Sequence, residues 1–318
     1  MDRNLALEFV RVTEAAAISS ARWMGRGDKH AADHAATEMM RKVFNDVKIS
    51  GTVVIGEGER DEAPMLYIGE KIGNGNGIKI DIAVDPLECT NSVAYGRPNA
   101  ISVLAASPKG TILHAPDIYM DKIAVGPEAR GVIDLDAAVE ENLKAVADAK
   151  NMKVKDLMVV VLDRERHTKL ISEIRKAGAR IRLITDGDIS GAISTCLSTS
   201  DIDILMGIGA APEGVISAAA IRCLGGEMQT RLQFKDEKQR ERARSMGIKN
   251  LDKKMTEKDL VNTDRSMFVA TGVSTGTFLK GVDFTPAGAK TYSIVMRQKS
   301  GTIRFIEAHH VFEDEPKY

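Results

Sequence analysis

The alternation of apolar runs with helical stretches in the second half of the chain constrains the fold most. The apolar runs are "LMVVVLD", "ARIRLIT" and "DIDILMGIG", and the helical stretches between or after them are "HTKLISEIRKAG", "ISGAISTCL" and "GVISAAAIRCLGG". Continuous apolar runs of this length are typical of strands buried on both faces, and strand–helix alternation indicates crossover connections. We therefore expect an α/β fold with a parallel sheet in this half.

The first half begins with two helices. The first covers "NLALEFVRVTEAAAISSARWMG" and ends at Gly25 and Gly27, and the second runs from its N-cap, Asp28, to about residue 47. The strands expected after them are "GTVVIGEGE", "IKIDIAVDP", "AISVLAAS", "TILHAP" and "DKIAVG". Pro86 is expected to end the second of these strands, because proline cannot donate to a sheet ladder.

The last third of the chain completes the expected organisation. "AAVEENLKAVADAKN" predicts a helix, residues 236–254 predict a solvated helix or loop, and "MFVATGV" and "TYSIVMRQKSGTIRFIEAHH" predict closing strands with a Ser-Gly turn. We expect a domain boundary near residue 155, which gives an N-terminal metal-binding α+β domain over residues 1–155 and a C-terminal α/β substrate-binding domain over residues 156–318.

Composition argues against several classes of protein. The chain has 318 residues, a formal net charge of −1 and only 4% aromatic residues, so neither a basic nucleic-acid surface nor a stacking platform for single strands is expected. No apolar stretch reaches the ~18 residues of a membrane span. The three cysteines are far apart and form neither a metal pair nor a disulfide framework, so a reducing cytoplasm is the expected location.

Carboxylates gather at the expected strand ends. Asp85 and Glu88 close the strand "IKIDIAVDP" with Thr90 just beyond them, and Glu57 follows "GTVVI". Ligands of open α/β sheets bind beyond the carboxyl ends of the strands, and carboxylate oxygens suit Mg²⁺ and Mn²⁺. Each motif alone is more often an ordinary turn. Together with a hydroxyl and a helix start that could face an anion, they favour hydrolysis of a phosphate by a metal-activated water.

"DPLE-x-T" resembles the D-P-[IL]-[DE]-G-T motif of the lithium-sensitive, metal-dependent sugar and inositol phosphatases. The segments "GEGERDEAPMLYIGE", "APDIYMDK", "DGDISGAIS" and "MGIGAAPEGVISAAAIRCLGG" resemble one branch of that superfamily, the class II fructose-1,6-bisphosphatases. The resemblance runs over nearly the whole chain and implies a layered αβαβα sugar-phosphatase fold with two sheet-containing halves. The segments "DIAVDP" and "SMGIKN" are similar to segments of those family members that also hydrolyse sedoheptulose 1,7-bisphosphate.

The resemblance also implies roles for individual residues. The implied ligands of two or more Mg²⁺ or Mn²⁺ ions are Asp33, Glu57, Asp85, Glu88 and Glu213. The implied catalytic residues are Thr90, which would assist the attacking water, Glu57 and Asp85. The implied substrate contacts are Glu88, Cys89, Thr90, Tyr119, Arg164, Glu165, Arg166, Asp186, Gly187, Asp188 and Ala210. The implied assembly is a homodimer or homotetramer.

The chemistry of the substrate residues agrees with these roles, although each has a structural alternative. Arg164 and Arg166 follow an apolar strand and could hold a second, non-reacting phosphate, or they could be a solvated pair. Asp186 and Asp188 could accept hydrogens from sugar hydroxyls, although an isolated Asp-Gly-Asp is more often a turn. Cys89 departs from the resembled motif, which has glycine at that point.

Three functional hypotheses follow. The first is a phosphatase that removes the 1-phosphate of fructose 1,6-bisphosphate by in-line attack of a metal-activated water. The second keeps the chemistry and adds or prefers sedoheptulose 1,7-bisphosphate. The third is a regulator that binds a sugar phosphate without turning it over, a hypothesis motivated by Cys89.

Overall fold

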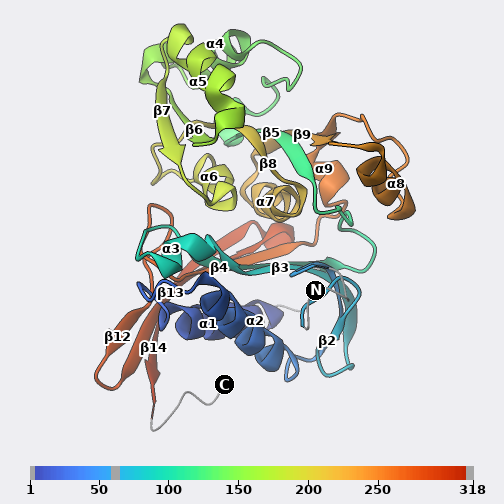
Figure 1. Cartoon of the computed structure of the whole chain (residues 1–318), viewed down its shortest axis with the longest axis vertical. Coiled ribbons are helices and arrows are strands. Elements are labelled where there is room, and N and C mark those ends of the chain that lie inside the picture. Colours follow the sequence, from blue (N-terminus) through green and yellow to red (C-terminus); the bar gives the residue numbers. More distant parts are fainter. Residues whose placement is uncertain (1–3, 59–64, 313–318) are drawn as a thin grey trace. The chain divides into compact units, whose positions relative to one another are not determined.

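The computed structural model describes residues 4–58 and 65–312, and the chain divides into two compact units (Figure 1). Unit 1 comprises residues 1–112 and 263–318, and unit 2 comprises residues 113–262. The boundary expected near residue 155 therefore falls inside unit 2. Local patterns do not reveal this division, because the last strands of the chain return to pair with strands of the first third.

Unit 1 contains one sheet and two long helices. Its described elements are α1 (Leu5–Ala21), α2 (Lys29–Phe44), β1 (Ile49–Ile55), β2 (Lys71–Ile72), β3 (Ile78–Glu88), α3 (Thr90–Ala94), β4 (Ile101–Pro108), β11 (Met267–Gly272), β12 (Asp283–Thr285), β13 (Gly288–Arg297) and β14 (Thr302–Val311). The strand order is β12-β13-β11-β4-β3-β1-β2, and β14 pairs with β13. Among the strand pairs described in this sheet, β1 and β3 form the one parallel pair, so their carboxyl ends share one edge of the sheet.

The two long helices of unit 1 cover one face of this sheet (Figure 1). As the sequence predicts, Asp28 caps α2, and its side chain accepts a hydrogen bond from the backbone N–H of Ala31 at 2.9 Å. The core between helices and sheet is largely apolar and includes Phe9, Met40 and Val269, each with no exposed surface. Burial of large side chains of this kind stabilises a fold by about 1.5–3 kcal/mol each.

Strand β3 continues through Pro86 instead of ending there, which corrects the expectation from the sequence. Its register with β4 shifts between Asp85 and Glu88, so Pro86 falls at an irregularity where the ladder is interrupted. The expected strand "TILHAP" is also absent from the described backbone of residues 111–116, which forms no strand element.

Unit 2 contains a second sheet with helices on both faces. Its elements are β5 (Tyr119–Val125), α4 (Val139–Ala149), β6 (Met158–Leu162), α5 (Thr168–Ala177), β7 (Arg180–Ile184), α6 (Asp188–Ser194), β8 (Ile204–Ala210), α7 (Ala211–Leu224), β9 (Glu227–Gln233), α8 (Glu237–Ser245), β10 (Met255–Thr256) and α9 (Glu257–Leu260), with short 3-10 turns between them. The strand order is β10-β9-β5-β8-β6-β7. The chain is thus an α/β protein with two sheets, as the sequence predicts.

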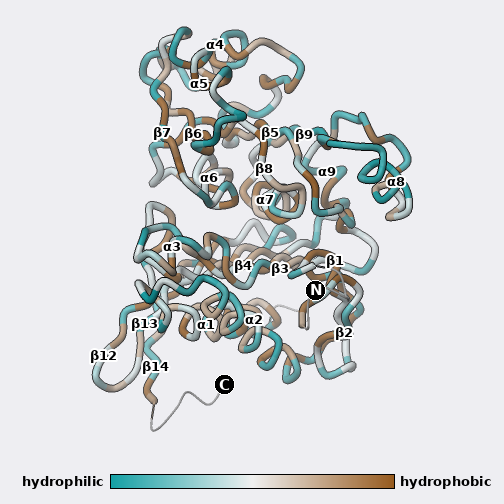
Figure 2. Tube along the Cα trace, in the orientation of Figure 1, coloured by the Kyte–Doolittle hydropathy of each residue, from teal (hydrophilic) through white to brown (hydrophobic). Residues whose placement is uncertain are grey.

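The sheet of unit 2 is mixed rather than parallel. Strands β6, β7 and β8 run parallel and are joined through α5 and α6, as expected from the alternating pattern. Strand β5 pairs antiparallel with both β8 and β9. Helices α4 and α5 cover one face and α6 and α7 the other (Figure 1), while Figure 2 shows α8 as hydrophilic, in agreement with the solvated segment expected there.

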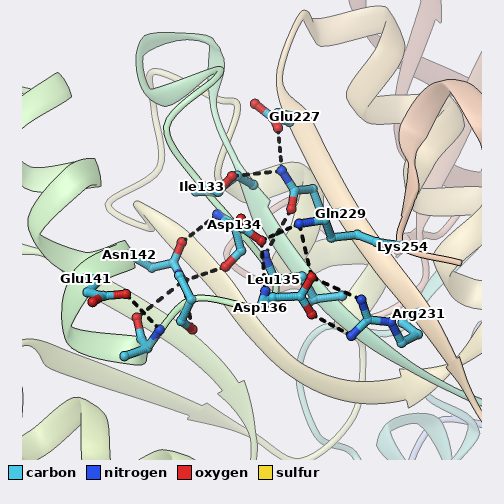
Figure 3. A network of polar contacts seen from close by, with 12 residues as sticks. Ile133, Asp134, Leu135, Asp136, Glu141, Asn142, Glu227, Gln229, Arg231 and Lys254 are labelled. Carbon is cyan, nitrogen blue, oxygen red and sulfur yellow. Dashed lines mark hydrogen bonds and ion pairs between the residues drawn. The ribbon is translucent and has the colours of Figure 1, made fainter. Parts of the chain in front are cut away.

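A polar network ties the segment before α4 to strand β9 (Figure 3). Arg231 forms a two-pronged ion pair with Asp136, with N···O distances of 2.6 and 3.1 Å, and Lys254 Nζ lies 3.2 Å from the same carboxylate. These two cations lower the pKa of Asp136 to about 2. Gln229 accepts a hydrogen bond from the backbone N–H of Leu135 at 2.9 Å. The network therefore anchors β9, which pairs with β5, to the segment before α4.

Unit 1 contains a buried acid that makes its stability depend on pH. Glu14 of α1 accepts a hydrogen bond from Thr291 Oγ1 at 2.9 Å, and His310 Nε2 lies 4.0 Å from its carboxyl. Burial raises the pKa of Glu14 to about 6.

Among the described residues, no helix is both long and apolar enough to cross a membrane.

The raised pKa of Glu14 predicts a loss of stability as pH rises. The folded state binds this proton more tightly than the unfolded state, so its contribution is full below pH ~4.5 and is lost as pH rises through about 6. Glu14→Gln should therefore gain up to ~2 kcal/mol relative to wild type between pH 4.5 and pH 8. Urea unfolding of both proteins across this range measures the difference. A difference that stays constant with pH would contradict the assignment.

Candidate active site

Three acidic side chains approach one another in unit 1. Asp33 lies on α2, Glu57 follows β1, and Asp85 lies near the end of β3. The side chains of Asp33 and Glu57 share a hydrogen bond, which requires a proton between the two carboxyls. Burial, followed by the charges of Asp33 and Asp85, raises the pKa of Glu57 far above its usual value. A divalent cation among these groups would relieve the repulsion that a proton relieves in its absence.

The backbone beside Glu57 is held by a close contact that only glycine permits. The N–H of Glu57 donates to the carbonyl of Leu66 at 3.1 Å, and a Cβ on Gly56 would lie 2.0 Å from that carbonyl oxygen. The carboxylate of Glu70 in turn accepts from the N–H of Leu66 and pairs with Arg41 of α2. The motif "GEGERDEAPMLYIGE" is therefore anchored at both ends, and its residues 59–64 lie outside the described part of the chain.

The turn after Asp85 brings further site residues into place. Asp85 Oδ1 accepts a hydrogen bond from the N–H of Leu87 at 3.1 Å, and Glu88 is buried at the end of β3. Thr90 is the first residue of α3. Cys89, between them, has φ +72° and ψ +51°, which is the left-handed region that favours glycine. The resembled motif has glycine here, and the turn itself requires the left-handed conformation.

Cationic and aromatic side chains gather in unit 2. The guanidinium of Arg166 lies 4.7 Å from the ring centre of Tyr119, and Lys235 Nζ lies 4.9 Å from it. Arg166 donates to the carbonyl of Ile208 at 2.8 and 3.0 Å, and neither cation has a carboxylate within salt-bridge distance in the described structure. Arg164 is paired with Asp186 at 2.7 Å. Two of these cations thus remain available to an anion.

A buried histidine aligns this cationic segment with strand β8. One ring nitrogen of His167, Nδ1, lies 2.7 Å from the carbonyl oxygen of Leu162, and the other, Nε2, accepts from the N–H of Ile208 at 2.7 Å. Burial, with the charges of Arg166 and Arg164, lowers the pKa of His167. A Cβ on Gly207 would lie 3.0 Å from the ring. His167 is therefore neutral and has a structural part.

The remaining expected substrate residues also lie in unit 2. Ala210 is directly opposite Tyr119 in the pairing of β8 with β5. Gly187 has φ +90° and precedes α6, and Asp188, its first residue, is buried against Lys122. Glu165 is exposed in the turn before His167. The expected substrate residues from Tyr119 to Ala210 thus belong to one unit.

Glu213, the fifth expected metal ligand, lies in the first turn of α7 in unit 2, whereas the other four belong to unit 1. Its participation stays a prediction. Within residues 4–58 and 65–312, no three acidic, histidine or cysteine side chains stand so that they could hold an ion as they are. The donor chemistry of Asp33, Glu57 and Asp85 nevertheless fits a hard divalent cation, because all their donors are carboxylate oxygens.

Comparison with known proteins decides the family. A model of the family described as bacterial fructose-1,6-bisphosphatase, glpX-encoded, matches residues 3–310. The chain belongs to this family. Its similarity to curated members is high along its entire length, and the family consists of phosphoric monoester hydrolases.

Three cyanobacterial members of the glpX-encoded bisphosphatase family illustrate this similarity. Each is named D-fructose 1,6-bisphosphatase class 2/sedoheptulose 1,7-bisphosphatase. The protein of Microcystis aeruginosa is 48% identical over 342 residues, that of Synechocystis sp. is 48% identical over 341, and that of Crocosphaera subtropica is 47% identical over 342. Each alignment covers 100% of this chain and 99% of the relative.

Two basic residues near the expected substrate contacts are not predicted from the sequence. Lys122 lies in β5 and contacts Asp188, and Lys235 follows β9 and lies over Tyr119. Lys122 belongs to the segment "APDIYMDK" and Lys235 begins a charged stretch, but neither context indicates that the side chain meets Asp188 or Tyr119. The glycines of "GIGAAPEG" are an indirect signal, because glycine in a regular strand marks a close approach by another group.

The left-handed conformation of Cys89 predicts a gain in stability on substitution by glycine. A residue with a Cβ in this region costs about 1–2 kcal/mol, and part of the gain is offset by the greater freedom of glycine in the unfolded chain. Cys89→Gly should be roughly 1 kcal/mol more stable than Cys89→Ala, which also lacks the thiol but keeps the strain. Urea unfolding of the two variants measures this difference. Equal stability would show that the turn is not strained.

Proposed function

We propose that this chain hydrolyses the 1-phosphate of fructose 1,6-bisphosphate with the help of Mg²⁺ or Mn²⁺. The single observation that carries the proposal is the meeting of Asp33, Glu57 and Asp85, three carboxyls from separate elements, where burial and then mutual repulsion raise the pKa of Glu57. Perturbed acids of this kind mark functional sites. Membership in the glpX-encoded bisphosphatase family supports the same reaction.

The chain's own residues have distinct parts in this proposal. Asp33, Glu57, Asp85 and Glu88 would hold the ions, together with Glu213. Bound divalent ions supply charge stabilisation and an acidified water at neutral pH. Thr90, at the start of α3, orients the attacking water by its hydroxyl. Protein side chains thus fix the direction of attack on the 1-phosphate.

The second phosphate is held, in this proposal, by the cations around Tyr119. Arg166 and Lys235 lie on its ring without a carboxylate partner among the described residues, and a phosphate would neutralise them. Arg164 is less available, because Asp186 already pairs with it. Recognition of the far phosphate would distinguish a bisphosphate from a monophosphate.

Sedoheptulose 1,7-bisphosphate is a second candidate substrate. The observation that favours it is the name shared by the three relatives above, each described as acting on both sugars. The reacting phosphate is the same in both sugars. A comparison of kcat/KM for the two substrates measures the preference, and no turnover of the seven-carbon sugar would remove this candidate.

The proposed reaction predicts phosphate release that depends on metal and on the acidic cluster. Purified protein should release phosphate from fructose 1,6-bisphosphate with Mg²⁺ or Mn²⁺ and lose this activity in EDTA. Glu57→Gln should lose activity by at least about 100-fold, the scale of one lost group that stabilises transition-state charge. Asp46→Asn is the matched control, because this acid is exposed at the end of α2.

Two results would overturn the proposal. Full activity after removal of all divalent ions would exclude the metal-dependent reaction. Binding of the sugar bisphosphate without turnover under every divalent ion tested would favour the non-catalytic regulator instead.

A further inference from the structure

A buried ion pair joins strand β5 to the start of α6 in unit 2. Lys122 Nζ lies 2.5 Å from Asp188 Oδ2, and the two side chains are only 2% and 5% exposed. Lysine and aspartate are almost never buried so deeply unless they are paired. A buried pair is also weak evidence for stability, because removing both charges from water costs about as much as their attraction returns. The pair therefore calls for a functional reason.

The chain makes room for this pair with two glycines. A Cβ on Gly209 would lie 2.0 Å from Asp188 Oδ2 and 2.9 Å from Lys122 Nζ. A Cβ on Gly214 would lie 2.6 Å from Met120 Sδ and 3.4 Å from Lys122 Cε. Gly209 does not have a positive φ, so space rather than backbone conformation requires glycine there. Two glycines of "GIGAAPEG" thus accommodate side chains.

One oxygen of the pair is left without a partner. Asp188 Oδ1 is buried and has no hydrogen-bond donor in the described structure. A buried carboxylate oxygen without a donor is costly, and a ligand that supplies a hydrogen would remove the cost. The ligand group that donates to Asp188 Oδ1 must be neutral or cationic, because the Asp188 carboxylate would repel an anion such as phosphate. A sugar hydroxyl meets this requirement.

The surroundings place this oxygen at the substrate side of unit 2. Asp188 lies against Gly209, and the next residue, Ala210, is opposite Tyr119, which carries Arg166 on its ring. The cations suit a phosphate and the free carboxylate oxygen suits a hydroxyl. One unit therefore offers complementary groups to both parts of a sugar phosphate.

We propose that Lys122 is a positioning residue: by holding Asp188 Oδ2 it fixes the carboxylate so that Oδ1 accepts a hydrogen from a hydroxyl of the sugar. This inference rests on the proposed function and extends it to a residue that does not itself touch the substrate. Lys122 acts only through Asp188, and that restriction makes the inference testable.

The test is a double-mutant cycle on binding of fructose 6-phosphate and on KM for fructose 1,6-bisphosphate. Asp188→Asn and Lys122→Met should each weaken binding about 10- to 100-fold, the value of a hydrogen bond to a charged group. The double variant Lys122→Met/Asp188→Asn should bind like Asp188→Asn alone, because effects that act through one group do not add. The double variant also removes both buried charges. It should therefore fold even if Lys122→Met alone, which leaves the Asp188 charge buried and unpaired, does not.

Lys150→Met is the matched control. Lys150, at the end of α4, forms a similar partly buried ion pair with Asp203 in the same unit. Asp203 precedes β8 at the end opposite Ala210, the residue that pairs with Tyr119. This variant should lower the melting temperature and leave KM unchanged. If Lys122→Met, normalised to folded protein, also leaves KM and binding unchanged, or if the two single effects add in the double variant, the proposal is wrong.

The measurement of fructose 6-phosphate binding distinguishes failure of this inference from failure of the proposed function. If wild type binds fructose 6-phosphate but hydrolyses no sugar bisphosphate, the catalytic proposal fails while the cycle on binding still decides the role of Lys122. If wild type hydrolyses the bisphosphate and the cycle is additive, the positioning role alone fails.

Discussion

Repulsion among the carboxyls at the end of strands β1 and β3 is the constraint on which the proposed chemistry depends. Parallel pairing of these strands brings Glu57 and Asp85 to one edge, and α2 adds Asp33. Burial with these neighbours raises the pKa of Glu57, so the cluster retains a proton that a divalent cation can replace. The fold thereby holds mutually repelling carboxyls together, and a bound divalent cation would replace this repulsion with attraction.

In both units, glycines leave room for polar groups to pack closely against the backbone. Gly56 admits the carbonyl that holds the backbone of Glu57, Gly207 admits the ring of His167, and Gly209 admits the carboxylate of Asp188. A Cβ would lie 2.0 Å from a polar oxygen at Gly56 and at Gly209, and 3.0 Å from the His167 ring at Gly207, where φ is also +135°. Cys89 is the converse case, because it keeps a Cβ where the backbone is left-handed.

The sequence predicts the local elements well and their long-range pairing poorly. Asp28 as N-cap of α2 and the strands and helices of residues 157–226 are confirmed, because capping and apolar runs are local signals. The division near residue 155 differs from the structure, since strand β11 returns to pair with β4 across more than half the chain. Pro86 likewise does not end β3, because the register shift absorbs it.

The site residues, too, divide into those that the sequence indicates and those that only the fold brings together. Asp33, Glu57 and Asp85 were expected together from a family resemblance, and the structure brings them together in unit 1. Lys122 lies in the resembled segment "APDIYMDK", but its role could not be predicted, because its partner Asp188 lies 66 positions away. Only the fold brings such residues together, and only the space left by Gly209 and Gly214 hints at them.

Calorimetric titration with Mn²⁺ tests the central claim about the acidic cluster most directly. A cluster that retains a proton must release it when the metal binds, so the observed heat should vary with the ionisation enthalpy of the buffer at neutral pH. Glu57→Gln should bind Mn²⁺ more weakly and lose this buffer dependence. A heat of binding that is the same in all buffers, or unchanged affinity in Glu57→Gln, would contradict the account.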